Sequence, residues 1–116
     1  MRKIVIQINA NNLHNMNGEV LSENTFYVML LGISLNFLSN QIFPSIAITT
    51  SLNDINNNNI SGILRNSLVV REIMDVVINN RISMPRDTVS ITDIKNTIIQ
   101  NLKTRFGDNN VTEVIF

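Results

Sequence analysis

Three aspartates carry the side chains in this chain best suited to acid–base or metal chemistry. Asp87 and Asp93 flank the start of a predicted helix, and Asp54 lies in an asparagine-rich stretch. Carboxylates that converge can hold Mg²⁺ or exchange protons with a substrate. A metal-assisted hydrolase therefore requires the fold to bring one of these aspartates next to another acid. Asp93 is explained more simply as a helix-capping residue, and Asp87 as a loop residue.

The only histidine, His14, lies among asparagines in a predicted loop. A catalytic imidazole needs a nucleophile or a carboxylate brought beside it, and the local sequence offers no such partner. We interpret His14 as a solvated loop residue. The absence of cysteine excludes disulfides, thiolate catalysis and cysteine-based zinc sites. We therefore predict no catalytic residue, no metal ligand and no cofactor.

The basic residues offer a different chemistry, the binding of phosphate. Four of them lie on two predicted helices: Arg65, Arg71, Lys95 and Lys103. Nine basic and nine acidic residues cancel over the whole chain, whereas a nucleic-acid-binding domain normally carries a clear basic excess. Solvation of the helices is the favoured interpretation. A small nucleic-acid-binding regulator that uses these four residues is the alternative.

The rest of the composition is dominated by side chains without reactive groups. The chain has 20 asparagines and 18 isoleucines among 116 residues, and these residue types form turns and cores respectively. Only 16% of the residues are charged, compared with about 25% in an average protein. A neutral chain with few charges has little electrostatic protection against self-association, so we expect a homo-oligomer. The composition is also typical of AT-rich coding DNA, which makes a viral or phage origin one interpretation.

The first half of the chain predicts strands around one ambiguous segment. Isoleucines at alternate positions in residues 3–9 indicate a strand, and Asn17-Gly18 is a hairpin signal. Residues 25–38 fit both the helical and the strand period, so this segment stays open between the two. Pro44 is expected to end it, and residues 45–52 predict a further strand.

Residues 24–53 carry no formal charge, so a membrane helix has to be considered. Their most apolar part, Phe26 to Leu38, has 13 residues, whereas a membrane helix needs about 20. We therefore expect a buried core element and no membrane span.

The second half predicts two helices and a terminal strand. In chain order, the predicted elements are a loop at 53–59, a helix at 61–78, a loop at 79–87, a helix at 90–106 and a strand at 111–116. Ser61 and Ser90 are the expected caps of the helices, and Glu72 is expected on the solvent side of the first. Gly107 is placed to adopt a left-handed closing conformation after the second helix.

These elements predict a single α+β domain over residues 1–116. A sheet of about four strands is covered by two helices, in the order strand, strand, strand, helix, helix, strand. The helices are expected on one face of the sheet. If residues 25–38 are helical, the order becomes strand, helix, strand, helix, helix, strand, which is an α/β arrangement.

The second half resembles the flagellar basal-body FliL family. Arg65 to Ile78 (RNSLVVREIMDVVI) resembles the first long helix of that family, Ser90 to Phe106 the second, and Val111 to Phe116 (VTEVIF) the strand that follows. The resemblance covers roughly half of the chain and rests on pattern, without a diagnostic motif. It implies that residues 25–38 form a strand and that the protein is a ring-forming partner of the flagellar motor. Family members carry an N-terminal membrane span, which we do not expect in this chain.

The absence of catalytic chemistry, the low charge and the apolar segments 26–48 and 111–116 favour a small non-enzymatic interaction or assembly module. Its partner is expected to be a second copy or another protein. A flagellar accessory protein and a viral or phage accessory or structural protein are two versions, in the periplasm and in the cytoplasm (host cytoplasm for a virus) respectively. The terminal strand either completes its own sheet or pairs with another subunit. The predicted interface residues are Val111, Val114, Ile115 and Phe116.

Overall fold

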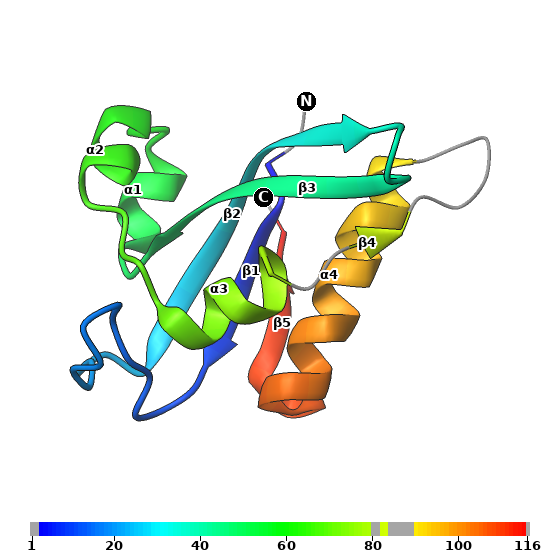
Figure 1. Ribbon diagram of the computed structural model, residues 1–116. Helices are drawn as coiled ribbons and strands as arrows, with labels where there is room; N and C mark the ends of the chain where they lie inside the picture. Colours follow the sequence, from blue (N-terminus) through cyan, green and yellow to red (C-terminus); the bar gives the residue numbers. More distant parts are fainter. Residues whose placement is uncertain (1–2, 80–81, 84–89, 116) are drawn as a thin grey trace.

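The computed structural model describes residues 3–79, 82–83 and 90–115, which form one antiparallel sheet with helices against both of its faces (Figure 1). The strands are β1 (Val5–Asn9), β2 (Thr25–Asn36), β3 (Gln41–Thr49), β4 (Ile82–Ser83) and β5 (Val111–Val114). The helices are α1 (Leu52–Asn56), α2 (Ile60–Arg65), α3 (Arg71–Val77) and α4 (Ile91–Phe106), and a 3₁₀ turn, η1 (Asp108–Asn110), precedes β5. The predicted α+β class and its order are confirmed, and residues 25–36 form a strand.

The strands lie in the order β4-β3-β2-β1-β5, and every neighbouring pair is antiparallel. β1 therefore lies inside the sheet, with Val5 opposite Met29 of β2 on one side and Val114 of β5 on the other. The terminal strand thus completes the sheet of its own chain, which is one of the two roles expected for it.

The main core lies between the sheet and the helices α3 and α4. Every second residue of β1 and of the first half of β2 points into it, as the two-residue period of a strand requires. α4 supplies residues spaced four apart, which share one face of a helix. Fully burying a side chain of this kind stabilises the fold by about 1.5–3 kcal/mol. The enclosed side chains of the main core include Ile8, Phe26, Ile48, Ile73 and Leu102.

A smaller apolar cluster covers part of the opposite face. It joins Val5 and Ala47 of the sheet to Ile55 of α1 and Ile63 of α2. Figure 1 shows these two helices at the end of the sheet where β3 ends. The sequence placed the helices on one face only. The strands carry apolar residues on both faces at this end, so a second layer of helices is needed to keep them from water.

The helix predicted over residues 61–78 consists of two helices, α2 and α3. The cap of α2 is Asn59, whose side chain accepts a hydrogen bond from a first-turn N–H at 3.1 Å, and not the serine that was expected. Between the helices, the Leu68 N–H donates to the Ile48 carbonyl of β3 at 2.8 Å. The β-branched pair Val69-Val70 favours extended backbone there. Because of this interruption, the direction in which each face of α3 points does not depend on that of α2.

Two short elements lie in segments predicted to be loops. α1 begins one residue before the predicted loop 53–59 and ends inside it. The Ser51 hydroxyl caps this helix by accepting a hydrogen bond from the Asp54 N–H. β4 lies within residues 79–87 and extends the sheet beside the start of β3. β4 extends the predicted sheet, whereas α1 belongs to the second layer of helices, and neither changes the fold class.

α4 is the helix that the sequence predicted most clearly. Ser90 caps it as expected, and its hydroxyl accepts a hydrogen bond from the Asp93 N–H at 3.0 Å. Gly107 after it has a φ of 98°, a positive value that favours glycine, with an extended ψ of 144° in place of the left-handed helical value expected. Within the described residues, no helix combines the length and the hydropathy that a membrane crossing requires.

β2 contains a β-bulge between Leu30 and Gly32. One extra residue in a strand reverses the faces to which all following side chains point. Leu35 consequently lies opposite Ile42 and points to the face that α3 and α4 cover, as Leu30 does. The bulge therefore puts Ile33 and Leu35 on the same face as Phe26, Val28 and Leu30.

Pro44 does not end the element before β3, as the sequence predicted, but lies inside β3 opposite Ile33. Proline has no N–H to donate, so this pair cannot exchange the two hydrogen bonds of a bonded antiparallel pair. Because bonded and non-bonded pairs alternate along such a ladder, the N–H and C=O of Ile33 point away from β3. The described pairing of β4 with β3 covers only Gln41 and Ile42. Pro44 therefore lies at an edge position of β3, where the missing N–H of a proline costs no ladder hydrogen bond.

Candidate functional site

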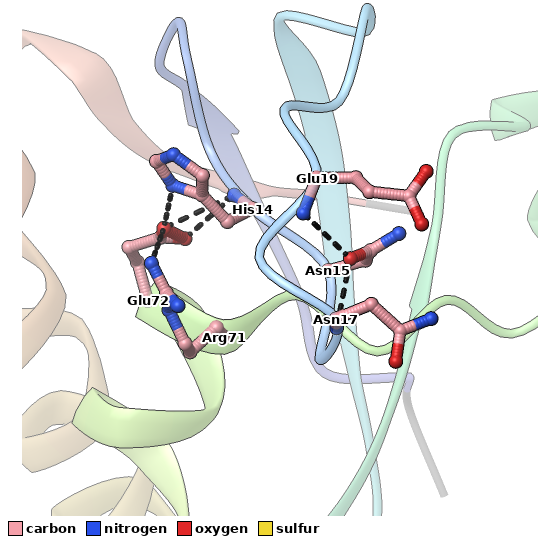
Figure 2. Close-up of polar contacts among 6 residues, drawn as sticks. All are labelled: His14, Asn15, Asn17, Glu19, Arg71 and Glu72. Carbon is pink, nitrogen blue, oxygen red and sulfur yellow. Dashed lines mark hydrogen bonds and ion pairs between the residues drawn. The ribbon is translucent and has the colours of Figure 1, made fainter.

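A buried carboxylate holds the loop after β1 against α3 (Figure 2). The Glu72 side chain accepts hydrogen bonds from the His14 backbone N–H at 3.0 and 2.9 Å, and its Oε1 lies 2.5 Å from the ring Nδ1 of His14. An ionised carboxylate only accepts hydrogen bonds, so Nδ1 carries the proton. Glu72 is only 9% exposed. The predicted position of Glu72 on the solvent side of its helix is therefore wrong. His14 lies in a loop as predicted, with 30% of its side chain exposed, but it has the carboxylate partner that the local sequence did not offer.

A tight turn positions His14 for this contact. The side-chain oxygen of Asn15 accepts hydrogen bonds from the N–H groups of Asn17 at 2.9 Å and Glu19 at 3.0 Å (Figure 2). His14 then pairs with Val20 in a single antiparallel bridge. The turn that the Asn-Gly dipeptide predicted is confirmed, although it closes a hairpin of one bridge and not a long strand pair.

The first turn of α3 binds the other side of His14. The Arg71 N–H donates to the His14 carbonyl at 2.8 Å, so both backbone polar groups of His14 are bonded to this helix. The Arg71 guanidinium lies 3.9 Å from Glu72 Oε1, and an ion pair of this length with a half-exposed arginine contributes little. The contact joins residues that are 58 positions apart. No local pattern in the sequence signals it.

The surroundings of Glu72 act on its pKa in two directions. Burial raises the pKa, because it disfavours the charged form. The hydrogen bonds from the His14 N–H and ring, the N–H of Glu72 itself and the charge that the ring carries when protonated all lower it. These favourable contacts prevail, and the pKa of Glu72 lies below its ordinary value of 4.5.

This lowered pKa predicts that acid weakens the fold through Glu72. The unfolded chain takes up the Glu72 proton more readily than the folded chain, so the stabilisation is complete above pH 4.5 and is lost as the pH falls from 4.5 through the folded pKa. Urea denaturation at a series of pH values should show this loss in the wild type, and E72Q should flatten it. D75N, at an exposed acid on the same helix, is the control. An unchanged acid profile in E72Q would contradict the assignment.

The pair has two parts of a catalytic arrangement, a base and the carboxylate that orients it. No Ser or Thr hydroxyl of the described residues bonds to the His14 ring. Among the same residues, no group of three His, Asp or Glu side chains is placed to hold a metal ion. The geometry therefore assigns His14 and Glu72 a structural role, as a clamp between the loop and α3.

The basic residues considered as phosphate contacts lie on different faces of the sheet. Arg65 is on α2, which packs into the smaller cluster, whereas Lys95 and Lys103 are on α4, which covers the main core. The Lys95 Nζ lies 3.1 Å from Glu113 Oε1 of β5. Arg71 begins α3, on the same side as α4. The structure thus brings three of the four to one side, and two of these three, Arg71 and Lys95, lie next to a carboxylate.

Two of the three aspartates, Asp54 and Asp93, are also separated. Asp54 is on α1 and accepts a hydrogen bond from the Asn59 amide at 3.2 Å. Asp93 is in the first turn of α4, across the sheet from α1. Asp87 lies outside the described residues. The structure therefore does not bring Asp54 and Asp93 together.

The predicted interface residues of the terminal strand are partly used inside the chain. Val111 is 3% exposed in the main core, and Val114 packs against the smaller cluster. Ile115 is 66% exposed, and Phe116 lies outside the described residues. β5 is the last strand of the described sheet, so its outer edge has no strand beside it there.

Exposed apolar side chains gather on the outer part of the β2–β3 hairpin, which Figure 1 shows reaching past the start of α4. Their exposed fractions lie between 36% and 100%, and the residues are Leu31, Ile33, Leu35, Phe37 and Leu38. Ile91 of α4 lies beside them and lines a hollow of about 90 Å³, together with Ile4 and residues of β2. No residue between 24 and 53 is charged.

The same part of β2 is open along one edge. Among the described residues, β1 pairs with β2 from Thr25 to Met29, and the last contact is the Leu30 N–H, which donates to the Ile4 carbonyl at 3.0 Å. We call residues 31–36 the open half of β2. The sequence indicated an apolar segment here, but the end of the described pairing with β1 became visible only in the fold.

Comparison with protein-family models, curated proteins and solved structures finds no match to this chain. The resemblance to the FliL family therefore stays a prediction.

Proposed function

We propose that this chain is a small non-enzymatic assembly module that forms homo-oligomers. The observation that supports the proposal is the open half of β2, an uncharged sheet edge that exposes apolar side chains. Proteins normally protect such edges with charged residues, proline or a covering element. Contiguous exposed apolar surface is typical of an interaction site.

The charge of the chain favours a second copy as the partner. Nine acidic and nine basic residues cancel, so two copies approach without net repulsion. The open half of β2 itself has no charge that would require an oppositely charged partner. A flagellar or a viral setting for this assembly stays a prediction.

The mass of the native particle tests this function. Light scattering coupled to size-exclusion chromatography should give a multiple of the 13.1 kDa chain mass at micromolar concentrations. On dilution, the mass should fall toward that of one chain, because association depends on concentration. A single species of 13.1 kDa at every micromolar concentration would contradict the proposal.

A further inference from the structure

We infer that two copies of this chain pair through the open half of β2, antiparallel and about a two-fold axis at Ser34, so that their sheets join into one. The inference rests on the proposed function and names the contact within it. An antiparallel arrangement of identical strands is the one that a two-fold dimer generates, because each copy then offers the same surface to the other.

The backbone of this segment offers the required hydrogen-bonding groups. Pro44 turns the N–H and C=O of Ile33 away from β3, and the alternation of the ladder does the same for Leu35. No described strand takes up these groups. A second copy of β2 would satisfy them without any change in the chain.

The positions of the outward groups restrict the register. Only residues whose backbone groups point outward can form bonded pairs, so Ile33 lies opposite Leu35 of the second copy, and Leu35 opposite its Ile33. Each of these pairs exchanges two N–H···O bonds. The axis then passes through Ser34, and the paired stretch, residues 32–36, stays clear of the bulge. An axis at Ile33 would instead draw Leu31, in the bulge, into the pairing.

The side chains in this register are apolar where they meet. Ile33 and Leu35 face each other across the axis on the side of the sheet that α4 covers. Phe37 of the second copy, which is 82% exposed in one chain, lies next to Leu31. The hollow beside Leu31 and Ile91 is at this place.

The exposed apolar area approaches that of a standard dimer interface. Apolar side chains at this edge are exposed by 36–44% at four positions and by 82% and 100% at the turn. With roughly 150–200 Å² for a fully exposed large side chain, they present about 600 Å² per copy. A standard interface buries about 800 Å² per partner, and the strand backbone adds to the side-chain area. Residues 24–53 carry no charge, so the paired strands themselves bring no like charges together.

Cysteine scanning tests the contact directly, because the chain contains no cysteine of its own. Ser34 is exposed, and on the axis it would lie opposite Ser34 of the second copy as a non-bonded pair. The Cα atoms of the two residues would then be about 4.5 Å apart, within the roughly 4.4–6.8 Å that a disulfide spans. S34C should therefore form a disulfide-linked dimer under mild oxidation. S45C is the matched control, an exposed serine on the same face of β3. The two Ser45 residues of the dimer would be separated by both β2 strands and would lie at least about 14 Å apart at a strand spacing of about 4.8 Å.

The expected result is a roughly tenfold larger cross-linked fraction for S34C than for S45C at equal concentration, with the mass of the native dimer. T112C, on the outer strand β5, separates the inference from the proposed function. Cross-linking of T112C without S34C would overturn the β2 contact and keep the assembly. A native oligomer in which neither variant cross-links would also overturn the β2 contact. A wild-type monomer without cross-linking of S34C would overturn both, and would leave the apolar edge to another protein or a lipid surface.

Discussion

L35D is expected to convert the oligomer into monomers while the chain stays folded. Leu35 is 43% exposed, so an aspartate there can be hydrated in the single chain and should change the free energy of unfolding by less than about 1 kcal/mol. In the dimer, the same carboxylate would be buried next to Ile33 of the second copy without a cation. An unpaired buried charge costs about 3 kcal/mol or more, which weakens the dissociation constant by at least roughly 100-fold.

The control for this variant is L64D. Leu64 lies on α2 and is 52% exposed, so the chemical change and the exposure match while the position is remote from the open half of β2. Sedimentation velocity should show monomers for L35D and wild-type mass for L64D at the same concentration. Oligomers of unchanged affinity in L35D would show that this edge is not the interface.

E72A is expected to cost about 2–4 kcal/mol of unfolding free energy, because hydrogen bonds to a charged group contribute about 1.5–3 kcal/mol each. The alanine leaves the His14 N–H and ring without their acceptor. E72Q keeps one acceptor oxygen and should lose about half as much. Urea denaturation at neutral pH measures these differences.

D75A provides the comparison on the same helix. Asp75 is exposed and accepts one hydrogen bond from the Asn79 amide at 2.9 Å. Its loss should change stability by less than about 0.5 kcal/mol, as is usual for surface positions. An E72A variant as stable as D75A would show that the clamp between the loop and α3 does not contribute to folding.

The sequence predicts the parts of this fold that depend on neighbouring residues. The Ser90 cap and the apolar spacing of α4 are local, and both are confirmed. The alternate isoleucines of residues 3–9 indicated a strand, and β1 forms there. Each of these features depends only on residues that are close together in the sequence, in one helix or one strand.

The parts that the sequence did not predict depend on contacts between distant residues. The break between α2 and α3 is held by a hydrogen bond from Leu68 to β3, and helical spacing alone continues through it. Glu72 was placed in solvent because its partner, His14, is 58 positions away. The face of Leu35 depends on the bulge after Leu30, and a strict alternation of residues places it on the wrong side.

The candidate interface was predicted only in part. The uncharged apolar segment around β2 was visible in the sequence, and so was the strand-forming character of Val111 to Phe116. Which edge of the sheet stays open depends on the length of β1, which ends its pairing with β2 at Met29. The length of a neighbouring strand is not encoded in the residues that it leaves uncovered.

The position of β1 between β2 and β5 has a consequence for synthesis of the chain. β1 is made early, but its second neighbour is complete only when Val114 has been added. Closing a loop of this length is entropically costly and slows folding. Until then, the free side of β1 is one more unpaired sheet edge on the nascent chain. Ribosome-bound intermediates are therefore expected to be more prone to aggregation, and more dependent on chaperones, than the released protein.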